Sequence, residues 1–112
     1  MIARHWRGWT KLHDADAYEE LLRTRVFPDL KQIQGYRGGY ILRKDSAEES
    51  EFVVMNLFET LDAVRKFAGP DYSVAVFEPE AKRLLVRIEN VANHYEVKHS
   101  TARYSNDETR SS

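Results

Sequence analysis

The pattern of apolar positions is clearest in residues 51–59, EFVVMNLFE, where almost every position is apolar. Successive side chains of a strand point to opposite faces, so this segment predicts a strand that is apolar on both faces. One face carries Phe52, Val54 and Phe58, and the other carries Val53, Met55 and Leu57. Such strands occur where both sides of a sheet are covered. Because the predicted helices suffice for one side only, a second subunit is expected to cover the other.

The remaining pattern predicts an alternation of strands and helices. Residues 2–12 alternate as a first strand, with charged residues on both faces. A helical stripe follows from Asp14, the expected N-cap, to about Val26, and Pro28 predicts a kink before a further turn. The later elements are a second strand at 36–44, the third strand at 51–59, a helix from Thr60 to Gly69, a short helix at 79–84 and a last strand at 91–97.

This order, β-α-β-β-α-β, predicts an α+β domain of the ferredoxin-like class. Its four-stranded antiparallel sheet carries both helices on one face. Gly38 and Gly39 in the second strand suggest a bulge, or a place where another group closely approaches the backbone. We expect one folded domain over residues 1–97, followed by a polar tail over 98–112 that is disordered or contacts a partner.

Composition and charge exclude several kinds of chemistry and partner. The 112 residues include no cysteine, so disulfides and thiol chemistry are excluded. With 17 basic and 18 acidic residues well mixed, the chain has no basic surface for nucleic acid. No apolar stretch resembles a signal peptide or reaches the roughly 20 residues of a membrane span. The four histidines show no paired spacing, so no metal site is expected. These features predict a cytoplasmic protein without nucleic-acid or membrane partners.

Polar residues among apolar neighbours are the candidates for chemistry. His5 and His94, in the first and last strands, could act as bases near neutral pH or make structural hydrogen bonds. Asn56 interrupts the apolar third strand, where its amide must find a hydrogen bond, either in a pocket or to a neighbouring strand. Tyr72 could donate to a substrate at the mouth between helix and sheet, or it could pack under a loop.

The first strand also carries two tryptophans and two arginines. Trp6 and Trp9 would lie on opposite faces, one toward the helices and the other toward a partner sheet. Arg4 and Arg7 could clamp an acidic substrate. They could equally pair with carboxylates across a subunit interface, which is the interpretation that we favour.

Five segments spread over residues 2–97 follow a known pattern. They are 2–8 (IARHWRG), 28–43 (PDLKQIQGYRGGYILR), 51–69 (EFVVMNLFETLDAVRKFAG), 71–80 (DYSVAVFEPE) and 93–97 (NHYEV). Together they resemble the antibiotic biosynthesis monooxygenase family of dimeric α/β-barrel proteins. The resemblance implies the same ferredoxin-like fold and a homodimer joined through the sheet face.

The haem-degrading branch of this family implies an Asn on the first strand, a Trp on the second helix and a His shortly after it. Here the first asparagine is Asn56, on the third strand, and Phe67 stands where the tryptophan would fall. Residues 71–80 contain no histidine, and Phe77 is near the expected position. Because the usual iron ligand is missing, haem degradation is not expected.

The other branch oxidises polycyclic phenols with molecular oxygen and without a cofactor. Resemblance to it implies an apolar cleft between helices and sheet that binds a small apolar or aromatic ligand. The candidates for catalysis are His5 or Asn56, to polarise the substrate, and Tyr72, to orient it. The candidates for substrate binding are Trp6, Arg7, Phe58, Phe67, Phe77 and His94. The alternative is a non-catalytic dimer that binds a small ligand or responds to stress.

Overall fold

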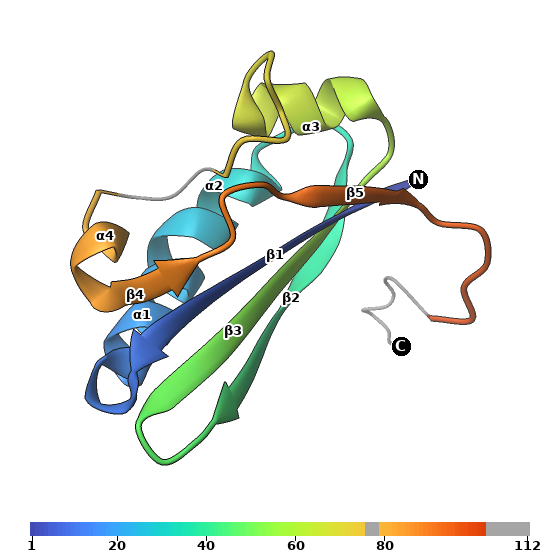
Figure 1. Cartoon of the computed structure of the whole chain (residues 1–112). Helices are drawn as coiled ribbons and strands as arrows, with labels where there is room; N and C mark the ends of the chain where they lie inside the picture. The colour runs from blue at the N-terminus through green and yellow to red at the C-terminus, as the bar shows by residue number, and fades with distance from the viewer. Residues whose placement is uncertain (76–78, 103–112) are drawn as a thin grey trace.

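An antiparallel sheet organises the computed structural model, which describes residues 1–75 and 79–102. Its strands are β1 (Ile2–Lys11), β2 (Tyr36–Asp45), β3 (Glu49–Phe58), β4 (Leu85–Ile88) and β5 (Asn93–Glu96). The strand order is β2-β3-β1-β4, and β5 also pairs with β1. β4 lies along residues 8–10 of β1 and β5 along residues 2–5, so these two short strands share one edge of β1 (Figure 1).

The fourth position of the sheet differs from its prediction. The predicted strand at 91–97 is shorter, as β5, and a separate strand β4 fills the rest of the edge directly after α4 (Ala81–Leu84). β4 could not be predicted from the sequence, because its four residues are too few to show a period. The first and last strands are thus direct neighbours, with His94 opposite Arg4.

The first helical region is longer and more continuous than predicted. After a 3-10 turn at Leu12–Asp14 it consists of α1 (Ala15–Leu21), a π-helical turn at Leu22–Val26 and α2 (Phe27–Lys31). Pro28 lies in the first turn of α2, where its missing N–H costs little, so the irregularity precedes the proline instead of following it. Asp14 occupies the N-cap position of α1 but makes no side-chain capping hydrogen bond.

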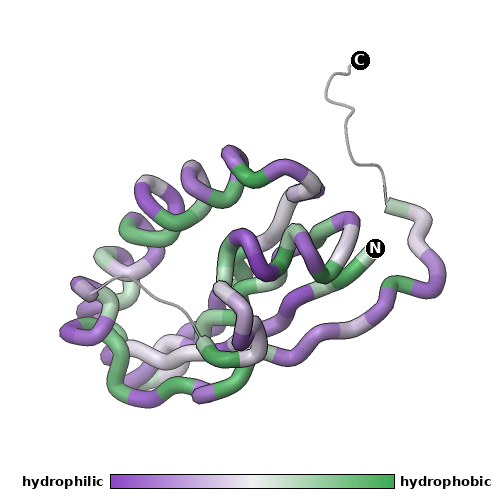
Figure 2. The backbone as a smooth tube through the Cα atoms, turned by 90° about the horizontal axis from the view of Figure 1, so that it is seen from above, coloured by the Kyte–Doolittle hydropathy of each residue, from purple (hydrophilic) through white to green (hydrophobic). Residues whose placement is uncertain are grey.

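The second helix, α3 (Leu61–Ala68), agrees with its prediction. The Thr60 hydroxyl oxygen accepts a hydrogen bond from the Ala63 N–H at 3.2 Å, and the helix ends at Gly69, whose φ is +86°. The helices lie on one side of the sheet (Figure 1). In the long helical segment the hydrophobic positions face the rest of the molecule, as Figure 2 shows.

The two faces of β3 alternate as its sequence predicts up to Asn56, whereas Leu57 is buried within the subunit. Phe52, Val54, Asn56 and Phe58 are buried on the side that the helices cover. On the other side, Val53 and Met55 are only half-buried, and Tyr40 and Leu42 of the neighbouring strand are each 49% exposed. We call this side the open face; it carries Ala3, His5, Arg7, Tyr40, Leu42, Val53, Met55 and Tyr95. Leu57 belongs to the same face but is only 7% exposed, and among the described residues no helix lies over the open face (Figure 1).

Two features lie outside this core. Among the described residues, no helix has the length and apolar character needed to cross a membrane. Residues 98–102 of the predicted polar tail form neither helix nor strand, and the rest of the tail lies outside the described residues.

Candidate functional site

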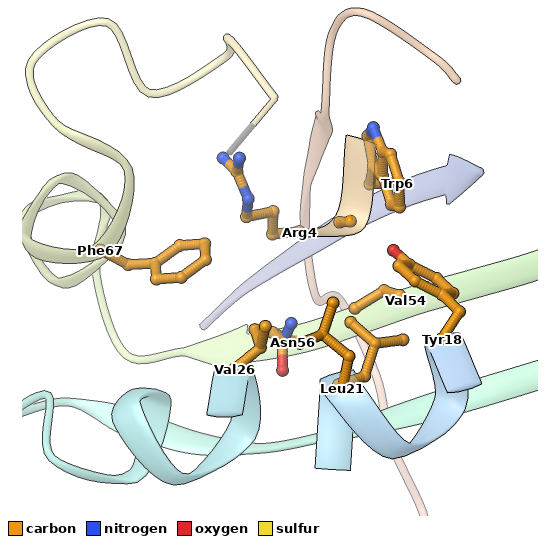
Figure 3. Close-up of a pocket in the computed structure, with 10 residues that line it drawn as sticks. Arg4, Trp6, Tyr18, Leu21, Val26, Val54, Asn56 and Phe67 are labelled. Carbon is orange, nitrogen blue, oxygen red and sulfur yellow. The ribbon is translucent and has the colours of Figure 1, made fainter. Parts of the chain in front are cut away.

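A small pocket lies between the covered face of the sheet and the helices (Figure 3). Its volume is about 40 Å³. The lining side chains come from β1, β3, the long helical segment, α3 and α4: Arg4, Trp6, Tyr18, Leu21, Leu22, Val26, Val54, Asn56, Phe67 and Ala81. Most of these are apolar, so Arg4, Asn56 and Tyr18 supply its polar chemistry. Of the residues predicted for the site, Trp6, Asn56 and Phe67 line this pocket.

Arg4 places a guanidinium at one wall of the pocket. The residue is only 5% exposed, and its N–H groups donate to the backbone carbonyls of Tyr72 and Val74. Its Nη1 also lies 3.0 Å from the Nε2 atom of His94. Within the described residues no carboxylate pairs with it. Burial lowers the pKa of Arg4 to about 10, so the group is still charged at neutral pH.

Arg4 was predicted to lie at a subunit interface, and the structure places it inside the subunit instead. Residues 4 and 6 of β1 face the helices, which puts residues 5 and 7 on the open face. Because charged residues lie on both faces of the strand, the sequence did not indicate which face is turned toward the helices.

Asn56 lies directly opposite Arg4 on the neighbouring strand. Its side chain is buried, and its Oδ1 accepts a hydrogen bond of 2.7 Å from the Tyr36 hydroxyl. In Figure 3 the amide nitrogen lies on the side of Arg4 and the oxygen on the opposite side. Both interpretations drawn from the sequence therefore apply, since the same amide bonds to a neighbouring strand and lines the pocket.

Tyr18 is a third polar group of the pocket that the sequence did not single out, because it continues the apolar stripe of the helix. Its ring packs edge-on against Phe52, with centroids 4.9 Å apart. Its hydroxyl is turned toward Trp6 in Figure 3 and has no hydrogen-bond partner within the described residues. Burial raises the pKa of Tyr18, so this phenol stays protonated and can donate a hydrogen bond.

His5 and Arg7, predicted for catalysis and substrate binding, lie on the open face and do not line the pocket. The Nδ1 atom of His5 is buried and has no hydrogen-bond partner among the described residues. Arg7 pairs with Glu89 at 2.9 Å and with Glu51 at 3.5 Å, both in its own chain. The alternation of β1, which turns Arg4 and Trp6 inward, is the reason for both placements.

Tyr72 and His94 lie behind Arg4 rather than in the pocket lining. Their rings meet edge-on at 4.9 Å, and both residues accept hydrogen bonds from Arg4, His94 through Nε2 and Tyr72 through its backbone carbonyl. Burial, and then the charge of Arg4, lower the pKa of His94. A neutral imidazole can accept the hydrogen bond, so these two residues hold the guanidinium in place.

The remaining candidates fall in three different places. Phe58 is fully buried and stacks on Phe67 with a centroid distance of 6.4 Å, so it supports the pocket wall from behind. The indole N–H of Trp6 donates to the Glu89 carbonyl at 2.6 Å. Phe77 lies outside the described residues. Those residues also contain no cluster of three or more side chains suited to bind a metal ion.

Comparisons with known proteins support the fold. No family model matches the chain, and no curated protein matches it. Among solved structures, a Bacillus cereus protein described provisionally as an antibiotic biosynthesis monooxygenase matches with a TM-score of 0.62 and 17% sequence identity. The match covers 91% of this chain and 97% of that one. The chain therefore shares its ferredoxin-like α+β fold with the Bacillus cereus protein. The description of that protein names the same family that this sequence resembles.

Proposed function

We propose that the chain is a cofactor-independent monooxygenase that binds a small aromatic or phenolic compound, in its ionised form, in the pocket between helices and sheet. The observation that carries this proposal is Arg4, a buried guanidinium that no described carboxylate neutralises. The fold shared with the Bacillus cereus protein supports the same class of function.

The electrostatics of the pocket favour an anion. A charged group buried among apolar side chains is costly unless an opposite charge or several hydrogen bonds compensate it. The backbone carbonyls of Tyr72 and Val74 compensate Arg4 only in part, since they carry no net charge. A phenolate or enolate oxygen between Arg4 and the amide nitrogen of Asn56 would complete the pairing. Fixed donors of this kind are also suited to stabilise the charge of an oxygen-reactive substrate.

The chemistry then requires only the ionised substrate and molecular oxygen. An electron-rich phenolate or enolate carbon can react with oxygen directly. Overall, a CH₂ carbon of the keto form becomes a carbonyl: one oxygen atom forms the new C=O, and the other leaves as water with both hydrogens. The substrate supplies all four electrons, so no external reductant is needed. Trp6 and Phe67 would provide the walls for its flat ring.

The size of the pocket implies that it opens when a ring binds. A cavity of about 150 Å³ holds benzene, whereas this pocket measures about 40 Å³. Phe67 and Val26 are half-buried, which makes them the lining side chains best able to move outward. An aromatic substrate is therefore expected to displace at least one of them on binding.

One observation favours the alternative, a dimer that binds a small ligand without turnover. Among the described residues, the side chains that line the pocket include no histidine, carboxylate, lysine or cysteine, so none of these can act as a base near neutral pH. A monooxygenase with this pocket must take up a substrate that ionises in solution. A binding protein has no such requirement.

Oxygen consumption separates the two functions. Purified protein, incubated with a panel of phenols from one ring to the three rings of anthrone, is expected to consume one O₂ per substrate, without added flavin, nicotinamide or metal. The measurement uses an oxygen electrode, with product formation followed by absorbance. No uptake above buffer over the whole panel would contradict the monooxygenase. Ligand-induced thermal stabilisation without uptake would establish the binding function in its place.

We also propose that a second copy of the chain covers the open face. Its half-buried Val53 and Met55 and its exposed Tyr40 and Leu42 form an apolar surface, which a two-fold partner presenting the same surface would bury. Each subunit would keep its own pocket, because the pocket lies on the opposite side of the sheet.

Replacing Leu42 with lysine is expected to convert a dimer into a monomer. The new charge would have to be buried at the interface, whereas in the isolated subunit it would remain in water. Light scattering after size exclusion, over a range of protein concentrations, measures the change. Thr24→Lys, on the exposed side of the helical layer, is the control and should remain dimeric. A wild-type chain that is monomeric at all concentrations would contradict the dimer.

A further inference from the structure

Asn56 is held from behind by Tyr36, which the sequence did not single out, and by Gly39, one of the two glycines predicted to allow a close approach to the backbone. The Tyr36 hydroxyl donates to its Oδ1 at 2.7 Å, and Gly39 is its direct neighbour on β2. We infer that Tyr36 and Gly39 are positioning residues, which keep both N–H donors of Asn56 turned into the pocket, and that the pocket consequently selects an anionic oxygen over a neutral group of the same shape. This inference rests on the proposed function only in assigning the ligand to the same pocket.

Tyr36 is suited to this task because it remains a donor. Its side chain packs against Phe58, with ring centroids 5.5 Å apart, and burial raises its pKa. The neutral phenol donates a hydrogen bond to Oδ1. The oxygen of the Asn56 amide therefore faces Tyr36, and its nitrogen faces the pocket. This one hydrogen bond, made outside the pocket, determines which way the amide oxygen and the amide nitrogen point.

Gly39 supplies the space for this arrangement. A Cβ atom at this position would lie 2.1 Å from Oδ1 of Asn56 and 2.8 Å from the Tyr36 hydroxyl oxygen, closer than any side chain permits. In glycine a hydrogen takes that place and points toward Oδ1. Such a C–H group attracts an acceptor weakly and would repel the N–H groups of a reversed amide. The adjacent bulge, between Tyr36 and Gly38, brings the Tyr36 ring to the same place.

The resulting set of pocket groups is nearly free of acceptors. Arg4 and the Asn56 nitrogen can only donate, and the N–H of Trp6 is occupied by the Glu89 carbonyl. The Tyr18 hydroxyl can donate as well as accept, and the other side-chain acceptor among the described lining residues, Oδ1 of Asn56, is bonded to the Tyr36 hydroxyl. A carboxylate, phenolate or enolate oxygen satisfies these donors, whereas an amide or alcohol presents an N–H or O–H that finds few partners.

Acetate and acetamide are matched probes for this selection, since they have the same shape and differ in charge and in the N–H groups. Binding is followed by NMR titration at fixed pH and ionic strength, using the side-chain amide signals of Asn56 and the indole signal of Trp6. The wild-type chain is expected to bind acetate at least about tenfold more tightly than acetamide, as hydrogen bonds to a charged partner permit.

Tyr36→Phe tests the positioning role. It removes one hydroxyl and should lower the acetate-to-acetamide ratio about tenfold, because the amide can then reverse. The Asn56 amide signals should shift in the absence of any ligand. Tyr40→Phe is the matched control, as it removes the same group from the opposite face of the same strand. Tyr40 lies in the proposed subunit interface, so the ratio should be unchanged when size exclusion shows the same oligomeric state as the wild type. Asn56→Asp replaces the donors with an acceptor, and should abolish acetate binding while the chain remains folded by circular dichroism.

Each contrary result is decisive. Equal or tighter binding of acetamide, or no binding of either probe, would overturn the selection of an anion. An unchanged ratio and unchanged Asn56 signals in Tyr36→Phe would overturn the positioning role. None of these measurements uses oxygen. A chain that selects acetate but consumes no oxygen would therefore support this inference while contradicting the monooxygenase.

Discussion

Replacing Arg4 with methionine is expected to weaken the binding of an anionic ligand about a hundredfold and to abolish oxygen consumption. Methionine fills a similar volume without charge, so the pocket would lose the one cation among its described lining residues. Removing one partner of a desolvated charge pair typically costs 2–5 kcal/mol of binding free energy, which corresponds to a factor of about thirty to several thousand. Calorimetric titration with the tightest anionic ligand of the panel measures the loss.

The same substitution has a second, smaller effect on stability. The carbonyls of Tyr72 and Val74 lose their donor, which should lower the free energy of unfolding by about 1–3 kcal/mol. Arg23→Met, on the exposed side of the helical layer, removes a surface arginine and should change neither quantity. If Arg4→Met binds the anion as tightly as the wild type, Arg4 is only a structural support for the segment that contains Tyr72 and Val74.

Replacing Phe58 with alanine is expected to lower the free energy of unfolding by about 3–5 kcal/mol. The side chain is fully buried between Tyr36 and Phe67, so its removal leaves a cavity that its neighbours cannot fill. A domain of this size has a total stability of roughly 5–15 kcal/mol, so the variant would be close to unfolding at room temperature. Urea denaturation followed by tryptophan fluorescence measures the change.

Phe67→Ala is the matched variant, because Phe67 stacks on the same ring but is half-buried and lines the pocket. It should cost less stability than Phe58→Ala and should enlarge the pocket, so that larger rings bind more tightly. Equal losses of stability for the two variants, without any change in ligand size preference, would show that Phe67 is a core residue and that the pocket is not used.

The architecture was predictable because the relevant patterns are long and regular. The ten-residue strands and the apolar stripes of the helices repeat often enough for their period to be recognised. Two of the short elements were not predicted, although the short helix at 79–84 and the last strand at 91–97 correspond to α4 and β5. β4 has only four residues, which are too few to show a period. The π-helical turn before Pro28 depends on backbone hydrogen bonds that no pattern of residues predicts.

The candidate site was predictable only in part. Asn56 could be found because it breaks an apolar strand. Arg4 could not be assigned to the pocket, because its strand carries charged residues on both faces. Its hydrogen-bond partners are backbone carbonyls, which every residue has, so the sequence does not identify them. His5 and His94 were candidates because histidine can act as a base near neutral pH. His5 faces away from the pocket, however, and His94 accepts a hydrogen bond from Arg4 behind the pocket wall. Tyr18 and Tyr36 look like ordinary core residues until their hydroxyl groups are placed.

Glu89, in the break between β4 and β5, links the two sides of the sheet. Its backbone carbonyl accepts the indole N–H of Trp6 on the pocket side. Its carboxylate accepts hydrogen bonds from the backbone and the guanidinium of Arg7, on the open face. A single residue thus fixes a wall of the pocket and a charged group of the proposed subunit interface. Assembly and ligand binding are consequently expected to be thermodynamically linked, with each favouring the arrangement of Glu89 that the other requires.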